Sequence, residues 1–161
     1  MRAIIVGCGR TGAGIAEALA AEGHDVTIID VTSNAFRRLP ADFPGSAIRG
    51  DGTDSDVLRR AGAEGADLFF AMTEGDNRNI LAAQLARDAF GARRVVAKIN
   101  DPVRAEAYTH LGLNCLCRTA MLVDALKRFL GMDGDPNARR IWEAVAPASE
   151  PASGRKGTEA S

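Results

Sequence analysis

The feature that most constrains this fold is a glycine-rich turn near the start of the chain. Residues 7–12 read GCGRTG and lie between an apolar run, residues 3–6, and a helical pattern. Gly7 permits a tight strand-to-helix turn, Gly9 lets backbone approach a pyrophosphate, and Gly12 allows the helix to pack closely on the strand. The free N–H groups of the helix N-terminus favour phosphate. The pattern predicts a dinucleotide-binding turn.

An acidic residue at the end of the second apolar run supports that interpretation. The run, residues 26–29, is followed by Asp30, 18 positions after Gly12. A carboxylate there accepts hydrogen bonds from both ribose hydroxyls of an unphosphorylated adenosine and repels a 2′-phosphate. We therefore expect NAD(H) or an adenine nucleotide rather than NADP(H). The alternative is that Asp30 merely caps a turn before Ser33.

Length and charge narrow the classes further. The chain has 161 residues, 46% of them apolar, which suits one domain with a real core. Its 20 basic and 21 acidic side chains give a formal charge of −1, so no long-range field attracts nucleic acid. No signal peptide and no apolar run of ~20 residues is evident, so a cytoplasmic protein is expected. Cys8, Cys115 and Cys117 are expected to be reduced thiols, the last two pointing the same way on one strand.

Strand-like runs alternate with helical patterns along the chain. The alternation predicts a Rossmann-like, doubly wound α/β fold with a parallel six-stranded sheet in the order 3-2-1-4-5-6. Thr53, three residues before Asp56, resembles a capping box, Asp101 precedes a proline as an N-cap, and Gly112 fits a helix stop. The strand-like runs are residues 3–6, 26–29, 47–49, 68–71, 95–99 and 113–117.

A ligand crevice is expected where the strand order reverses, between the first and fourth strands. Residues 72–79 follow the fourth strand, so they can close over a nucleotide bound at the glycine turn. Thr73 and Asp76 are the predicted contacts. The alternative, which is compatible with ligand contact, is that one of them caps a helix beginning near Asn79.

The last strongly apolar segment is a predicted helix over residues 119–130. Its apolar side chains lie along a wide stripe, so the helix needs burial on more than one side. The stripe consists of Leu122, Leu126, Phe129 and Leu130, widened by Met121, Val123 and Ala125.

Composition divides the chain after this helix. Residues 1–132 are assigned to the nucleotide-binding domain, and residues 133–161 to a short helix and a flexible tail. The short helix is expected over residues 137–145, around Trp142. Residues 147–161 are rich in Pro, Ala, Ser, Gly and charge without periodicity, which predicts disorder.

Four segments, taken in order, resemble the RCK N-terminal (TrkA-N, KTN) domain of Trk/Ktr potassium-uptake regulators. They are residues 7–12, 50–53, 73–79 and 97–102, and the resemblance runs from the first residue to about residue 130. It implies a non-enzymatic cytoplasmic domain that binds NAD(H), ATP or ADP as a regulatory signal. It also implies a homodimer or larger ring at the inner face of the membrane, beneath an integral-membrane potassium transporter or channel subunit.

The resemblance also assigns the ligand-binding residues. It places the glycine turn with Arg10 on the phosphates, Asp30 on the ribose, and Asp51 with Thr53 near the adenosine. A guanidinium suits phosphate because it makes bidentate, charge-assisted contacts. The full set of expected contacts is Gly7, Cys8, Gly9, Arg10, Thr11, Gly12, Asp30, Asp51, Gly52, Thr53, Thr73, Asp76, Asn79 and Lys98.

Two positions depart from the family pattern. Many relatives carry arginine at position 98, where it reaches the terminal phosphate or an adjacent subunit. Lys98 keeps the positive charge but lacks the paired N–H donors of a guanidinium. The alternative is that Lys98 is simply a charged residue at the end of a strand. Arg118 stands where many relatives have proline, before a helix that the family uses as a crossover onto a second subunit. The alternative for that helix is core packing within one subunit. Too few residues follow Gly131 for a second RCK subdomain, so a second RCK regulator is a possible partner.

The rival hypothesis is a small NAD-dependent oxidoreductase, because the same fold serves both roles. Tyr108 is followed four positions later by Gly112, so a Tyr-x-x-x-Lys pair is missing. His24 lies in a predicted turn and His110 at a helix end. A DNA-reading module is absent, and Cys115, Cys117 and His110 lack the spacing and fourth ligand of a zinc site. Catalysis is therefore not expected.

Overall fold

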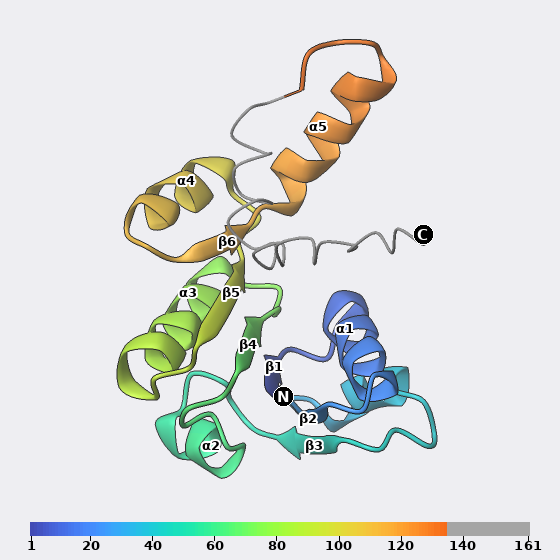
Figure 1. The fold of residues 1–161 in the computed structure, drawn as a ribbon, viewed down its shortest axis with the longest axis vertical. Coiled ribbons are helices and arrows are strands. Elements are labelled where there is room, and N and C mark those ends of the chain that lie inside the picture. Colours follow the sequence, from blue (N-terminus) through green and yellow to red (C-terminus); the bar gives the residue numbers. More distant parts are fainter. Residues whose placement is uncertain (135–161) are drawn as a thin grey trace, which may run out of the picture.

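The computed structural model describes residues 1–134. Six parallel strands form one sheet in the order β3-β2-β1-β4-β5-β6, which confirms the predicted topology (Figure 1). The direction of the strand order reverses between β1 and β4, where Val6 pairs with Ala71. The expected short helix over residues 137–145 and the tail lie outside the described residues. The strands are β1 (Arg2–Val6), β2 (Asp25–Asp30), β3 (Ser46–Arg49), β4 (Leu68–Ala71), β5 (Arg94–Lys98) and β6 (Asn114–Leu116).

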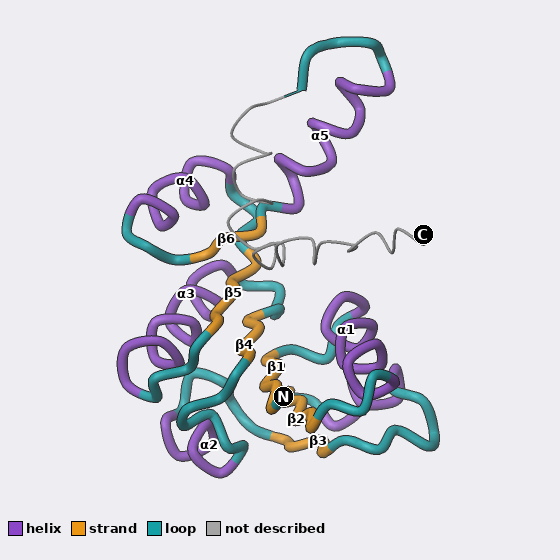
Figure 2. The backbone as a smooth tube through the Cα atoms, viewed as in Figure 1, coloured by secondary structure: helices purple, strands orange, loops and turns teal. Residues whose placement is uncertain are grey.

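Helices cover both faces of the sheet, as a doubly wound fold requires (Figures 1 and 2). One face carries α1 and the 3-10 helix η1, and the other carries α2, α3 and α4. Helix α3 runs on into a single π-helical turn, η2. Helix α5 projects away from the sheet. The helices are α1 (Arg10–Ala21), η1 (Ser33–Arg38), α2 (Ser55–Arg60), α3 (Asp76–Gln84), η2 (Leu85–Ala89), α4 (Pro102–His110) and α5 (Arg118–Phe129).

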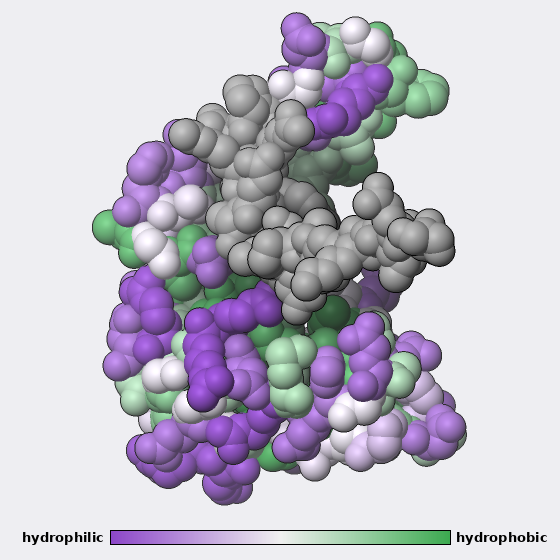
Figure 3. Space-filling model, viewed as in Figure 1, coloured by the Kyte–Doolittle hydropathy of each residue, from purple (hydrophilic) through white to green (hydrophobic). Residues whose placement is uncertain are grey.

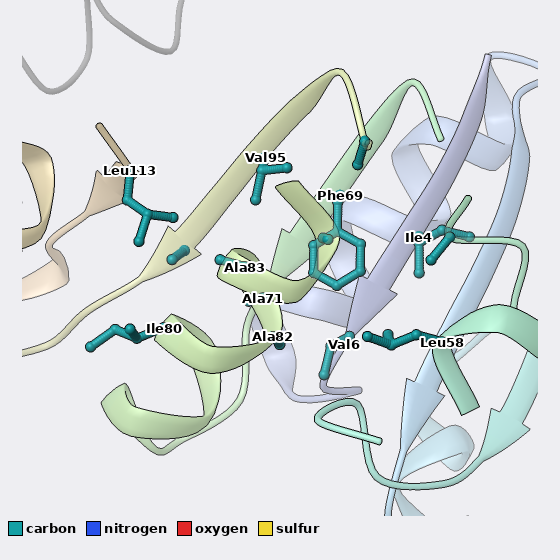
Figure 4. Packing of buried hydrophobic residues seen from close by; sticks show 14 of the residues in the cluster. Ile4, Val6, Leu58, Phe69, Ala71, Ile80, Ala82, Ala83, Val95 and Leu113 are labelled. Atoms are coloured by element: carbon teal, nitrogen blue, oxygen red, sulfur yellow. The ribbon is translucent and has the colours of Figure 1, made fainter. Parts of the chain in front are cut away.

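The core is built by strands that are apolar on both sides. Along β1, Ala3 and Ile5 pack on the α1 face, and Ile4 and Val6 pack on the opposite face. This follows from the two-residue period of a strand, and it explains why β1 reads as a continuous apolar run. On the second face Phe69 points from β4 toward the small alanines of α3, which let the helix lie close to the sheet (Figure 4).

The starts of α2 and α3 differ from the expectation, whereas the start of α4 agrees with it. The residue that caps α2 is Asp54, whose carboxylate accepts a hydrogen bond from the N–H of Asp56 at 2.8 Å. The expected capping box at Thr53 is therefore wrong, because the Thr53 hydroxyl donates to Asp51 instead, at 2.8 Å. The Asp101 cap is confirmed: its carboxylate accepts from the N–H of Val103 at 2.9 Å.

Helix α3 begins at Asp76 with Gly75 as its N-cap, three residues earlier than expected. Neither Thr73 nor Asp76 caps it, since no side-chain cap bond is present at this terminus. At the end of α4 the prediction is confirmed, because Gly112 follows the helix with φ +81°, a conformation that favours glycine.

The three cysteines are free and buried. The expectation that Cys117 lies on β6 beside Cys115 is wrong, because the strand ends at Leu116. It is the N-cap of α5, and its Sγ accepts a hydrogen bond from the N–H of Ala120 at 3.4 Å.

Helix α5 buries none of its residues within the chain. Leu122, Leu126 and Phe129 are exposed, Phe129 to 87%, and apolar surface is visible over this helix in Figure 3. Within residues 1–134, the predicted apolar stripe is therefore unpacked. Over residues 1–134, none of the helices combines the length and the apolar character needed to cross a bilayer.

Candidate functional site

A cavity of about 260 Å³ opens at the carboxyl ends of β1, β2 and β4, where the strand order reverses. This is the position at which doubly wound sheets bind ligands. Its walls come from the glycine turn, the end of β2, the loop after β3 and the loop after β4. The lining residues are Val6, Gly7, Cys8, Gly9, Ile29, Asp30, Val31, Ala35, Arg38, Gly50, Asp51, Gly52, Thr53, Met72, Thr73, Glu74 and Arg78.

The glycines of the turn have separate roles. Gly7 has φ +103°, and a Cβ on it would lie 2.8 Å from the backbone of Met72. A Cβ on Gly12 would lie 1.9 Å from the carbonyl oxygen of Gly7. Gly9 differs, because the nearest neighbour of its Cβ position is a Glu74 carboxylate oxygen at 4.0 Å. Gly7 and Gly12 are therefore required by the fold, whereas Gly9 keeps space open above α1.

The N-terminus of α1 faces this space without a cap of its own. Its N-cap is Gly9, no side chain caps it, and its first turn contains no acidic residue. The partial positive charge of the helix end is therefore available to an anion. Arg10, the first residue of the helix, adds a full positive charge and is exposed.

Asp30 is held at the end of β2 by backbone donors. Its Oδ2 accepts from the N–H of Cys8 and its Oδ1 from the N–H of Thr32, both at 2.8 Å. The carboxylate thus fixes the glycine turn and also the turn that follows β2, which was the alternative role. Each oxygen retains a further lone pair, so the side chain can still accept a hydrogen bond from a ligand hydroxyl.

The loop after β3 forms the opposite wall. The backbone N–H and the hydroxyl of Thr53 both donate to Asp51, and these bonds hold the pKa of the Asp51 carboxyl below its usual value. A Cβ on Gly52 would lie 2.1 Å from Val6. The absence of a side chain at Gly52 therefore lets the loop reach the end of β1.

Asn79 is fully buried and joins the ends of β4 and β5. Its Oδ1 accepts from the N–H and the hydroxyl of Thr73, at 2.8 and 2.7 Å. Its Nδ2 donates to the carbonyls of Thr73 and Lys98, at 3.0 and 2.7 Å. These bonds position Thr73 in the cavity wall, while Asn79 itself lies beneath the lining.

Asp76 also bonds to protein. Its carboxylate accepts from the N–H and amide of Asn100, at 2.9 and 3.0 Å, and from the N–H of Asp101, at 3.1 Å. Burial acts to raise the pKa of Asp76, but these donors outweigh it and hold the pKa low. Asp76 lines an adjoining polar groove rather than the cavity.

The remaining expected residues fall into two groups. Cys8 lines the cavity with a buried thiol, whose pKa is raised by that burial and by the nearby carboxylate of Asp30. Arg10, Thr11 and Lys98 line a second pocket beside it. Gly12 is buried within α1.

Sequence reasoning missed three charged lining residues: Arg38, Glu74 and Arg78. Arg78 and Glu74 belong to the segment 73–79, so their membership of that segment was an available signal. Arg38 reaches the cavity because η1 turns back toward the glycine turn, and no local pattern marks it. The cavity lining, taken over the described residues, contains no histidine or tyrosine side chain.

The sequence of residues 3–118 matches the family model described as the TrkA-N domain. The chain belongs to the TrkA-N family. Its relatives include the Trk system potassium uptake protein TrkA of Streptomyces coelicolor, 44% identical over 142 residues, 88% of this chain and 62% of that protein. The chain therefore spans less than two thirds of the length of this TrkA.

Solved structures share the TrkA-N fold at lower identity. The Kef C-terminal domain of Shewanella denitrificans in an AMP-bound form superposes with TM-score 0.66 at 23% identity, covering 89% of this chain and 90% of that one. The GsuK channel bound to NAD superposes with TM-score 0.64 at 19% identity, covering 81% of this chain and 23% of that one. Both support the Rossmann-like architecture.

Proposed function

We propose that this TrkA-N chain binds an adenine nucleotide, NAD(H) or ATP/ADP, and thereby regulates a membrane potassium transporter. The observation that carries the proposal is the pairing of an uncapped α1 N-terminus with the Asp30 carboxylate across one cavity, at the switch point of the sheet. The first feature suits phosphate and the second suits ribose hydroxyls.

The geometry suggests how such a ligand lies. Its phosphates lie above Gly9, the one glycine of the turn whose Cβ position is open. Its ribose reaches Asp30, and its adenine lies between the β2 and β3 loops, near Val31 and Asp51. The carboxylate of Asp30 disfavours a 2′-phosphate, so NADP(H) is expected to bind more weakly than NAD(H).

The comparisons support the ligand class and the partner. One structural neighbour is described with bound NAD and another with bound AMP, which share the adenosine monophosphate moiety. The Streptomyces relative is named as a potassium uptake protein. We therefore infer a cytoplasmic regulatory subunit, bound to the inner face of the membrane through its transporter, with a second RCK regulator as a further candidate partner.

The proposed output is a change in assembly. The exposed apolar stripe of α5 supports a homodimer or ring in which that helix packs on a second subunit. A nucleotide shifts such an assembly only if its affinity differs between two subunit arrangements. We infer that the ligand acts as a signal, because the Streptomyces relative is named as a potassium uptake protein.

Calorimetric titration with NADH, NAD, ATP, ADP and AMP tests the proposed ligand class. The test variant is Asp30→Ala, and the matched control is Asp25→Ala at the exposed, opposite end of β2. We expect saturable binding that the first change weakens and the second leaves intact, with urea denaturation verifying that both variants fold. If none of the five nucleotides bound, the proposal would be refuted.

A flux measurement tests the regulatory role. The chain is reconstituted with a Trk-type membrane subunit in proteoliposomes, and rubidium uptake is followed with and without the nucleotide that binds. We expect a nucleotide-dependent rate, accompanied by a change in small-angle scattering of the free chain. If neither the uptake rate nor the scattering profile changed when the nucleotide was added, the proposal that the ligand shifts the assembly would be wrong.

A further inference from the structure

Arg38 brings a positive charge to the same part of the nucleotide cavity as Asp30. It is the last residue of η1, which follows β2, and it lines the cavity together with Val31 and Ala35. Burial is the main cause of the raised pKa of the Cys8 thiol; Asp30 adds to this rise, and Arg38 opposes it. Both charged groups therefore lie near this one thiol. The cavity has an anion and a cation at the position proposed for the ribose.

The guanidinium of Arg38 is little used by the protein. Its hydrogen bond within residues 1–134 is donated by Nη1 to the Ala35 carbonyl, and at 3.5 Å that bond is long and weak. Arg38 is exposed, and neither it nor Asp30 forms an ion pair over the same residues. A guanidinium carries several N–H donors, so most of those of Arg38 remain available to a ligand.

The carboxylate of Asp30, in contrast, is held in place. Each of its oxygens already accepts one backbone N–H, from Cys8 or from Thr32. A ligand therefore meets a fixed acceptor that still has lone pairs to spare. Asp30 and Arg38 thus present a fixed acceptor and a free donor to the same ligand group.

A hydroxyl is the ligand group that satisfies both side chains at once. Its O–H donates one hydrogen bond, and its oxygen accepts another. A phosphate in the same place accepts strongly from a guanidinium but is repelled by a carboxylate. A hydrogen atom bonds to neither. A site built to bond a hydroxyl discriminates strongly against an analogue that lacks it, because the polar groups of the site are then left unpaired.

We propose that Arg38 is a specificity-determining residue that recognises the 2′ position of the ribose of the bound nucleotide. The inference rests on the proposed nucleotide site, which places the ribose at Asp30. The 2′-hydroxyl donates to the Asp30 carboxylate and accepts from the Arg38 guanidinium. A 2′-deoxyribose loses both contacts, and a 2′-phosphate keeps only the second. Arg38 therefore favours ribonucleotides over deoxyribonucleotides, and it reduces, without removing, the penalty that Asp30 imposes on NADP(H).

A purely structural role for Arg38 predicts a different pattern. The residue lies in the last turn of η1, where a cation suits the final carbonyls of a helix and where it bonds to Ala35. If that were its whole role, its loss would disturb the cavity wall and weaken every nucleotide by the same factor. Recognition of the ribose instead changes the ratio of affinities between nucleotides that differ only at the 2′ carbon.

Calorimetric titration of ADP, 2′-deoxy-ADP, NADH and NADPH into wild type and three variants tests the assignment. Arg38→Ala removes the guanidinium, and Arg38→Lys keeps the charge but lacks the paired N–H donors. The matched control is Arg37→Ala, which removes the neighbouring cation of η1; Arg37 is not among the residues that line the cavity. Urea denaturation verifies that all three variants fold.

We expect wild type to bind ADP at least about tenfold more tightly than 2′-deoxy-ADP. Arg38→Ala should weaken ADP about fivefold and 2′-deoxy-ADP by less than about twofold, because only the hydroxyl uses the guanidinium. NADPH should lose more than about tenfold in the same variant, and so more than NADH. Arg38→Lys should recover part of the NADPH affinity, and Arg37→Ala should leave all four affinities unchanged.

Equal losses for ADP and 2′-deoxy-ADP in Arg38→Ala, or an unchanged ratio of NADH to NADPH affinity, would overturn the role of Arg38 and leave the nucleotide site standing. Equal binding of ADP and 2′-deoxy-ADP to wild type would do the same. Where only one of the two pairs binds, that pair decides the question. If none of the four ligands bound wild type, the proposed function itself would be wrong.

Discussion

Replacing Gly12 by alanine tests the most sharply defined contact in the glycine turn. The new Cβ would lie 1.9 Å from the carbonyl oxygen of Gly7, whereas real Cβ contacts stay beyond 3.0 Å. The turn and α1 must separate by about 1 Å, and both partners are backbone that no rotamer change can relieve. Overpacking of this kind costs about 1–3 kcal/mol, and a rigid backbone neighbour places the change at the upper end of that range.

Gly14 provides the matched control, two residues further along the same helix. A Cβ on Gly14 meets nothing within 4 Å, so Gly14→Ala should stabilise the chain by about 0.5–1 kcal/mol through helix propensity alone. The free energies of unfolding come from urea titrations followed by circular dichroism. Gly12→Ala should also abolish nucleotide binding, because the displaced turn carries the α1 N-terminus with it.

The opposed signs of the two substitutions are the decisive result. If Gly12→Ala were as stable as wild type, or if both substitutions shifted stability equally, the proposed close approach of helix and turn would be wrong. Retained nucleotide affinity in a destabilised Gly12→Ala variant would instead show that the phosphate does not depend on this turn.

Three further predictions concern single polar or glycine positions. Gly9→Ala should leave the urea midpoint within experimental error and abolish nucleotide binding measured by calorimetry, because its Cβ enters open space above α1; a destabilised or fully competent variant would contradict this. Asn79→Ala should cost at least about 2 kcal/mol, since buried donors and acceptors lose their partners, whereas Asn77→Ala on the same helix should cost little. Asp76→Asn should cost about 1–3 kcal/mol at pH 7. Because hydrogen bonds hold the pKa of Asp76 below 3.8 in the fold, its stabilisation is present above that pH and is lost as the pH falls through the folded pKa. The stability gap between wild type and Asp76→Asn, followed by urea titrations across pH, should therefore be constant above about pH 4 and narrow as the pH falls below it, and a gap independent of pH would exclude an ionic role.

The strand order was predictable because its signals are local. The strands β1, β2, β4 and β5 contain short apolar runs, and helical patterns separate them. The right-handed crossover rule then leaves few topologies. Asp101 and Gly112 were predictable as helix boundaries for the same reason. Thr53 was not, because its hydroxyl donates to the neighbouring Asp51, and only the turn geometry decides that Asp54 caps α2.

The position of the cavity was predictable from the sequence, but the set of residues that line it was less predictable. Asp76 and Asn79 look like ligand contacts in sequence, yet their side chains hydrogen-bond to the protein itself. A polar residue in a motif does not disclose whether its partner is a ligand or a backbone group. Arg38 was missed because its approach to the cavity depends on the path of η1, which is a property of the folded loop.

The three glycines of the turn differ in how closely the backbone surrounds them, and this difference provides a sequence marker for the loss of the ligand site during evolution. Gly7 and Gly12 are held by backbone neighbours, so purifying selection on folding alone should preserve both. Gly9 has no such constraint from residues 1–134, and selection for the ligand is what would keep it. Descendants that abandon the nucleotide should therefore drift at position 9 first, while the flanking glycines persist in an otherwise intact domain.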